Sequence, residues 1–109
     1  MTVPPLDDDA RRRASRSAVE ARRTRAEWKG RLGSGDAALA ELLDAAEHDA
    51  ALAGMRVTDA LGALPGVGPR SVERILGVCG IAASRRIRGL GPNQRAALLA
   101  GPWGREARA

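Results

Sequence analysis

One stretch decides how this chain folds: Leu64-Pro65-Gly66-Val67-Gly68-Pro69-Arg70-Ser71-Val72-Glu73-Arg74-Ile75-Leu76. It has the form of a helix-hairpin-helix, in which an apolar helix ends, two glycines make a tight hairpin, and a second helix begins. Gly66 and Gly68 allow a positive φ and a close approach to the backbone. Pro69 suits the first helical position, where no N–H donor is needed. The hairpin amides and the helix N-terminus therefore favour an anion such as a phosphate.

The helix that follows the hairpin is predicted to have two chemically different faces. Arg70 and Arg74 share one side at i,i+4 spacing, and Ser71 lies beside them. The opposite side is apolar and is expected to belong to the core. It consists of Val72, Ile75, Leu76 and Cys79. This pattern indicates sequence-tolerant binding to a nucleic-acid backbone, although helix-hairpin-helix motifs also serve as packing or protein-interaction elements.

A second turn, Gly89-Leu90-Gly91-Pro92, repeats the chemistry of the hairpin. It has the same order of a glycine, an apolar residue, a glycine and a proline that opens a helix. Arginines can grip phosphate oxygens with two donors at once, and the helix N-terminus again favours an anion. We therefore expect a second contact with phosphate at this turn. Its polar side chains are Arg85, Arg86 and Arg88 before the turn, and Asn93 and Gln94 after it.

The N-terminal part is predicted to be one long helix that begins at the aspartates of residues 7–9 and runs to about Leu32. Aspartates suit a helix N-terminus because they face the positive end of the helix dipole. Small residues form a narrow seam along one face of this helix up to Trp28. Because these side chains can bury little surface, the half of the helix before Trp28 is expected to be only partly ordered in isolation. The broad opposite face is basic and is an additional candidate for nucleic-acid contact. The candidate residues there are Arg16, Arg22, Arg23 and Lys29.

The middle of the chain is predicted to hold two more helices. After a joint at 33–35, Asp36 is expected to cap a helix that ends at Gly54, and Thr58 is expected to cap a short helix that runs to Leu64. The i, i+3, i+4, i+7 spacing of apolar residues supports the first of these. The apolar positions are Leu39, Leu42, Leu43 and Ala46, and the acidic positions on the polar face are Glu41, Asp44, Glu47 and Asp49.

The last helix is predicted to run to about Ala100, and Gly80 is placed to end the helix before the second turn. No segment alternates between apolar and polar residues as a strand would. The fold is therefore expected to be all-α.

Charge is distributed unevenly along the 109 residues, which are enough for one domain plus at most an appendage. The net charge of +5 divides into −3 over residues 1–9, +7 over 10–31, −5 over 36–59 and +6 over 60–109. Two basic blocks thus flank an acidic middle, which favours a polyanionic partner. All basic residues except Lys29 are arginine.

Several classes of protein are excluded by what the sequence contains. Cys79 is the single cysteine, so an internal disulfide framework is impossible. No apolar run is long enough to span a membrane, and the start lacks the pattern of a signal peptide. His48 is the single histidine and is expected to be solvated among acidic residues. Without a nucleophile–base arrangement or paired catalytic carboxylates, we expect neither an enzyme nor a small-molecule substrate.

Aromatic residues separate two modes of nucleic-acid binding. Single-strand binders stack bases on aromatic side chains, and this chain has only Trp28 and Trp103. Trp28 is expected to lie in the core, and Trp103 lies in a tail rich in glycine and proline. Contact with the backbone of a duplex is therefore the better hypothesis.

Over nearly its whole length the chain resembles the actinobacterial integration host factor family. The matching segments are Ala21-Arg22-Arg23 with Arg25-Ala26-Glu27, Leu42-x-Asp44-Ala45, Leu64-Pro65-x-Val67-Gly68 and, most specifically, Arg85-Arg86-Ile87-Arg88-Gly89-Leu90-Gly91 followed by Asn93-Gln94. The family is unrelated in fold to the two-subunit β-arm proteins that share its name. One departure is the joint at 33–35, where family members often carry basic residues.

The resemblance implies a long N-terminal helix followed by a compact helix-two-turns-helix domain like one found in ribosomal proteins. It implies a nucleoid-associated, cytoplasmic protein that binds double-stranded DNA with little sequence preference, compacts the chromosome and supports phage integration. We expect a basic helix with a mobile start at 1–33, the DNA-binding domain at 34–101 and a flexible tail at 102–109. The implied DNA-binding residues are Gly66, Gly68 and Arg70 at the hairpin, and Arg85, Arg86, Arg88 and Gly89 to Gln94 at the second turn.

We also expect the protein to be a monomer and to need no cofactor. Hairpin carbonyls in helix-hairpin-helix proteins often hold a monovalent cation, here those of Leu64 and Val67. Two other functions stay open at this point. One is a module that binds RNA or the ribosome, and the other is a protein-interaction module that uses the acidic helix face.

Overall fold

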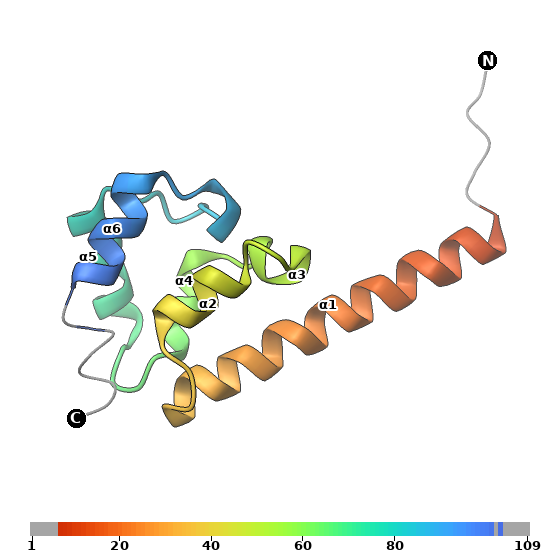
Figure 1. Ribbon diagram of the computed structural model, residues 1–109, viewed down its shortest axis with the longest axis horizontal. Helices are drawn as coiled ribbons and strands as arrows, with labels where there is room; N and C mark the ends of the chain where they lie inside the picture. The colour runs from red at the N-terminus through yellow and green to blue at the C-terminus, as the bar shows by residue number, and fades with distance from the viewer. Residues whose placement is uncertain (1–6, 102, 104–109) are drawn as a thin grey trace, which may run out of the picture.

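The computed structural model describes residues 7–101 and 103, and within them the fold is all-α, as predicted (Figure 1). The predicted mobile start at 1–6 and all of the predicted flexible tail except Trp103 lie outside the described residues. A long helix projects from a compact domain made of shorter helices and one 3-10 turn (Figure 1). The elements are α1 (Asp8–Ser34), α2 (Leu39–Ala45), α3 (Ala50–Ala53), α4 (Val57–Ala63), α5 (Pro69–Cys79), η1 (Ile87–Gly89) and α6 (Pro92–Ala100).

Helix α1 begins where the aspartates predict and packs on the domain only through its second half. The Asp7 carboxylate accepts a hydrogen bond from the amide of Ala10, at 2.6 Å. At 1.5 Å per residue its 27 residues span about 40 Å, yet its one buried residue is Leu32. Trp28 lies half-buried, and the Arg31 guanidinium stacks 4.2 Å from the centre of its ring. The prediction that the first half of this helix buries little is confirmed.

The joint after α1 lies slightly later than predicted. The helix continues through Gly33, where a Cβ would meet the carbonyl oxygen of Ala63 at 3.4 Å, so this glycine allows α1 and α4 to lie close together. The chain turns at Gly35, whose φ of 83° is in the left-handed region.

The single helix predicted from Asp36 to Gly54 is wrong. The structure has two shorter helices, α2 and α3, separated by turns at 46–49. Asp49, expected on an acidic helix face, instead caps α3: its carboxylate accepts from the amides of Ala51 at 2.9 Å and Leu52 at 3.4 Å. An aspartate side chain competes with the helical backbone for its N–H groups, and here it starts a new helix. Asp36 caps neither helix, because the residue before α2 is Ala38.

The start of α4 also differs from the prediction, since Arg56 rather than Thr58 precedes it. Residues 55–57 pair with residues 85–87 in a short antiparallel bridge. The amide of Val57 donates to the carbonyl of Arg85 at 3.0 Å, and the amide of Ile87 donates to the carbonyl of Met55 at 2.9 Å. This long-range pairing sets where α4 begins.

The core lies between the second half of α1 and the shorter helices. It contains the apolar positions predicted for 39–46 and for α5, including Cys79. No helix among the described residues is long and apolar enough to cross a membrane. The buried core residues are Leu32, Ala37, Leu39, Leu42, Leu43, Ala46, Leu52, Met55, Val57, Ala60, Leu61, Leu64, Val72, Ile75, Leu76, Cys79, Ile81, Ile87 and Leu98.

Candidate nucleic-acid interface

The first hairpin joins α4 to α5 as the sequence predicts. The amide of Val67 donates to the carbonyl of Leu64 at 3.2 Å, which closes a tight turn. Gly66 has a φ of 74° and therefore needs to be glycine. Gly68 does not, because its φ of −91° and ψ of 179° suit any residue, and a Cβ there would point into open space. Gly68 thus leaves the backbone accessible rather than making the turn.

The N-terminus of α5 lies at this hairpin. Pro69 occupies the first turn, and within the described part of the chain no side chain caps this helix. The first amides of a helix have no partner within the helix, so those of Arg70 and Ser71 are available to an anion. Arg70 and Arg74 are exposed beside them, and Ser71 is half-buried.

The second turn repeats one hydrogen bond of the hairpin and its opening proline, but not the positive φ of its first glycine. The amide of Leu90 donates to the carbonyl of Ile87 at 3.1 Å, just as Val67 donates to Leu64. Gly91 is extended, with φ of −74°, and Pro92 opens α6. Gly89 has no positive φ. Its lack of a Cβ leaves room for Arg85, since a Cβ would come within 2.9 Å of the Cδ atom of that side chain.

Arg85, Arg86 and Arg88 of the second turn are exposed, and backbone carbonyls hold the first two. Nη1 of Arg85 donates to the carbonyl of Gly89 at 2.9 Å, and Nη1 of Arg86 donates to that of Gly54 at 2.5 Å. None of the ion pairs between described residues involves Arg85, Arg86 or Arg88. A guanidinium has five N–H donors, so each retains donors for a phosphate. No carboxylate of the described residues therefore neutralises their positive charge, and that of Arg85 and Arg86 is held in place.

A shallow cleft of about 540 Å³ separates the middle of α1 from α3 and the second turn. Arg86 and Arg88 line it from one side, and Arg25 lines it from α1. The Nη1 atom of Arg25 donates to the carbonyl of Ala51 at 3.4 Å. Sequence reasoning did not select Arg25. Its spacing three residues before Trp28, beside the seam that docks on the domain, is the signal that could have found it.

The two residues with amide side chains after the second turn differ in their surroundings. Asn93 is exposed. Gln94 is engaged by the protein: its Oε1 accepts from the amide of Gly91 at 3.1 Å, and its Nε2 donates to the carbonyl of Gly80 at 2.8 Å. Gln94 thus ties the start of α6 to the end of α5, where Gly80 has the predicted left-handed conformation.

The two turns lie at opposite ends of the α4–α5 pair. The first connects the end of α4 to the start of α5, whereas the second is bonded to residues 55–57 just before α4 (Figure 1). With α4 of seven residues and α5 of eleven, the separation is roughly 10–16 Å. The additional candidates on α1 are all exposed, namely Arg16, Arg22, Arg23 and Lys29.

The acidic face of α2 is partly used within the protein. Arg95 of α6 reaches Asp44, with Nη2 to Oδ1 at 2.5 Å, and lies 3.9 Å from Glu47. His48 is exposed, as predicted. Within residues 7–101 and 103, no three His, Cys, Asp or Glu side chains cluster as metal ligands would.

Comparisons with known proteins agree with this architecture. A family model described as the S13-like H2TH domain matches residues 32–101. A protein named Integration host factor from Mycobacterium tuberculosis (strain ATCC 25618 / H37Rv) is 46% identical over 99 residues, which are 91% of this chain and 94% of that protein. One of the same name from Streptomyces coelicolor is 42% identical over 98 residues, or 90% and 92% of the two chains.

A solved structure described as sIHF bound to an 8bp palindromic DNA is also similar. Its sequence is 42% identical and its TM-score is 0.75. The match covers 77% of this chain and 94% of that one.

Proposed function

This chain belongs to the actinobacterial integration host factor family, and we propose on that premise that it binds double-stranded DNA through the phosphate backbone with little sequence preference. The observation that carries the proposal is the second turn. There, Arg85, Arg86 and Arg88 are exposed and free of carboxylate partners among the described residues, and backbone hydrogen bonds hold Arg85 and Arg86. Arginines held in this way bind phosphate oxygens bidentately.

The hairpin supplies the second point of contact. Its exposed Gly68 and the uncapped amides at the start of α5 form an anion site beside Arg70 and Arg74. Contacts of backbone amides and guanidinium groups with phosphate fix the protein on DNA but carry no sequence information. The separation of roughly 10–16 Å between the turns is comparable with the width of a major groove, about 12 Å. The two turns therefore suit phosphates on either side of a groove.

We propose that this two-point contact also allows the protein to bend and compact DNA. A clamp that fits bent DNA better than straight DNA bends it, at a cost of about 1–6 kcal/mol over a short site. The basic face of α1, with Arg16, Arg22, Arg23 and Lys29, offers further contacts with the same duplex or another. In this role the protein is architectural and non-enzymatic, acts as a monomer on the nucleoid in the cytoplasm, and supports phage integration. A monovalent cation at the carbonyls of Leu64 and Val67 is a secondary part of the proposal.

One observation favours a second candidate function. The family model that matches residues 32–101 is described as S13-like. This description suggests a ribosomal relative, and a ribosomal protein would bind structured RNA. A protein-interaction role for the acidic face of α2 is less favoured, because Arg95 already pairs with Asp44 there.

The proposal is tested by titrating the full chain against duplex DNA, single-stranded DNA of the same sequence and a structured RNA hairpin at one salt concentration. We expect the duplex to bind most tightly, since few aromatic residues are available to stack single-stranded bases. Tighter binding of the RNA hairpin would support the second candidate. If the protein binds none of the three nucleic acids, a protein-interaction role remains as the explanation.

A further inference from the structure

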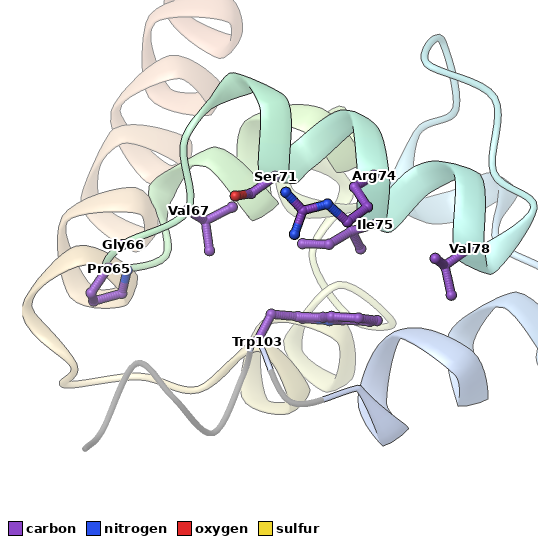
Figure 2. Close-up of a pocket in the computed structure, with 8 residues that line it drawn as sticks. All are labelled: Pro65, Gly66, Val67, Ser71, Arg74, Ile75, Val78 and Trp103. Carbon is purple, nitrogen blue, oxygen red and sulfur yellow. The ribbon is translucent and has the colours of Figure 1, made fainter.

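A cavity of about 430 Å³ opens between the hairpin, α5 and Trp103 (Figure 2). Val67, Ile75 and Val78 form its apolar wall, and Ser71 and Arg74 supply polar groups. Its volume is at the small end of the range for ligand sites, about 300–1,000 Å³. The cavity therefore has room for a single flat ring system but not for a nucleic-acid strand.

The indole of Trp103 forms the opposite side of the cavity and is firmly held. Its Nε1 donates to the carbonyl of Leu98 at 2.9 Å. The ring also lies against Gly101 so closely that any side chain at that position would overlap it. Figure 2 shows the ring edge-on, with one face directed toward Arg74 and Ile75 and with Val78 beyond its edge. With its N–H already bonded, the indole offers a ligand only its flat face, which suits stacking.

The other side of the cavity is apolar yet open to solvent. Val78 is 73% exposed, whereas the large hydrophobic residues on the buried face of the same helix are below 10%. Among the described residues that line the cavity there is no carboxylate, and Arg74 is the one charged group. A flat, partly apolar group attached to an anion therefore matches both its shape and its charge.

The cavity is continuous with the phosphate site of the hairpin. Gly66 and Ser71 line it, and Ser71 also contributes one of the free amides at the start of α5. A nucleotide whose phosphate rests on those amides would have its base beside the cavity. We propose, building on the proposed function, that this cavity receives one unstacked base of the bound DNA, sandwiched between Trp103 and the Arg74–Ile75–Val78 side of α5.

Such a site makes the protein prefer duplexes in which a base is already extrahelical. Unstacking a paired base costs a few kcal/mol, whereas a bulged base is available without that cost. Stacking of one base on an aromatic side chain is worth about tenfold in affinity. We expect the full chain to bind a duplex with a central single-nucleotide bulge about tenfold more tightly than the matched perfect duplex.

The first experiment compares three DNAs: the perfect duplex, the bulged duplex, and the same bulge with an abasic residue in place of its nucleotide. The abasic bulge is equally flexible but has no base to stack, so it should bind like the perfect duplex. Equal affinity for the two bulges would overturn the proposal, because flexibility alone would then explain the preference. If the perfect duplex binds and neither bulge binds more tightly, this inference fails while the proposed function stands. Absence of binding to any of the three contradicts both.

Variants locate the effect in the cavity. Val78→Glu places a carboxylate in the cavity, at an exposed position that tolerates substitution. It should reduce the ratio of the affinity for the bulged duplex to that for the perfect duplex to about one. Val19→Glu is the matched control, since Val19 is 43% exposed on α1 and the charge change is identical; this variant should keep the ratio. Equal ratios for both variants would overturn the assignment. Trp103→Leu should also reduce this affinity ratio to about one.

A spectroscopic measurement needs no variant. The fluorescent base 2-aminopurine, placed in the bulge, should be quenched when the wild-type protein stacks it on Trp103, and unchanged when it is paired within the perfect duplex. No quenching in the bulge at saturating protein would contradict the proposal. If equimolar dAMP displaces the bulged duplex, the cavity binds free nucleotides, and the proposal is also overturned.

Discussion

At the scale of single residues, the two glycines of the hairpin have different functions. Gly66 has a positive φ and makes the turn, whereas Gly68 has an ordinary extended conformation and faces open space. The sequence pattern could not separate them, because both belong to the same Gly-Val-Gly unit. Their backbone angles show that one serves the fold and the other leaves room for a ligand.

Alanine substitutions should separate these two functions. Gly66→Ala forces a Cβ into the left-handed region and should cost about 1–2 kcal/mol of stability. Gly68→Ala should leave the stability within about 0.5 kcal/mol, but its Cβ obstructs a phosphate and should weaken duplex binding. Urea unfolding and a duplex titration measure the two quantities. If Gly68→Ala binds DNA like the wild type, the hairpin backbone is not a contact.

Cys79 gives the stability a predictable dependence on pH. Burial against the core raises the pKa of its thiol above the ordinary value, so in alkaline solution the unfolded chain loses the thiol proton before the folded chain does. This contribution to stability is complete below the pKa of a free thiol, about 8.5, and is lost as the pH rises beyond it. Unfolding by urea at several pH values should show the loss in the wild type. A Cys79→Ala variant with the same alkaline slope would assign the effect to another group.

At the scale of elements, helices with local start and stop signals were predicted correctly. Helix α5 has Pro69 at its start, Gly80 at its end and one apolar face, and all three signals are local. The division between α2 and α3 was missed because Asp49 fits both an acidic helix face and a cap. The start of α4 depends on pairing of residues 55–57 with residues 85–87, which no local pattern reveals.

Helix α1 should be attached to the domain through its second half alone. Leu32→Ala removes its one buried side chain and should cost about 2–5 kcal/mol of global stability. Ala14→Gly, in the exposed first half, should reduce the helical circular dichroism slightly and leave the unfolding midpoint of the domain unchanged. A large loss of stability from Ala14→Gly would mean that the whole helix is part of the cooperative unit.

At the scale of the whole molecule, the sequence located most of the candidate site but not its arrangement. The resemblance of the two turns to one another was visible in the order of glycines and prolines. Both turns have the same closing hydrogen bond, but only the first has a glycine with a positive φ. Their placement at opposite ends of α4 and α5 depends on tertiary packing. The same holds for Arg25, which joins Arg86 and Arg88 in one cleft, and for Trp103, which packs beside the hairpin.

The central claim is that the arginines of the second turn bind the DNA backbone irrespective of sequence. The most direct test is the dependence of duplex affinity on salt, measured on two duplexes of unrelated sequence. If about 5–7 phosphates are neutralised, log K should fall with log salt with a slope of about −5 to −6.

Replacing Arg85, Arg86 and Arg88 by alanine should reduce the magnitude of that slope by about 3, equally on both duplexes. The matched control removes three exposed arginines near the start of α1, at residues 11–13, and should change it less. A flat salt dependence in the wild type, an equal reduction by the two triple variants, or a loss confined to one duplex would contradict the account.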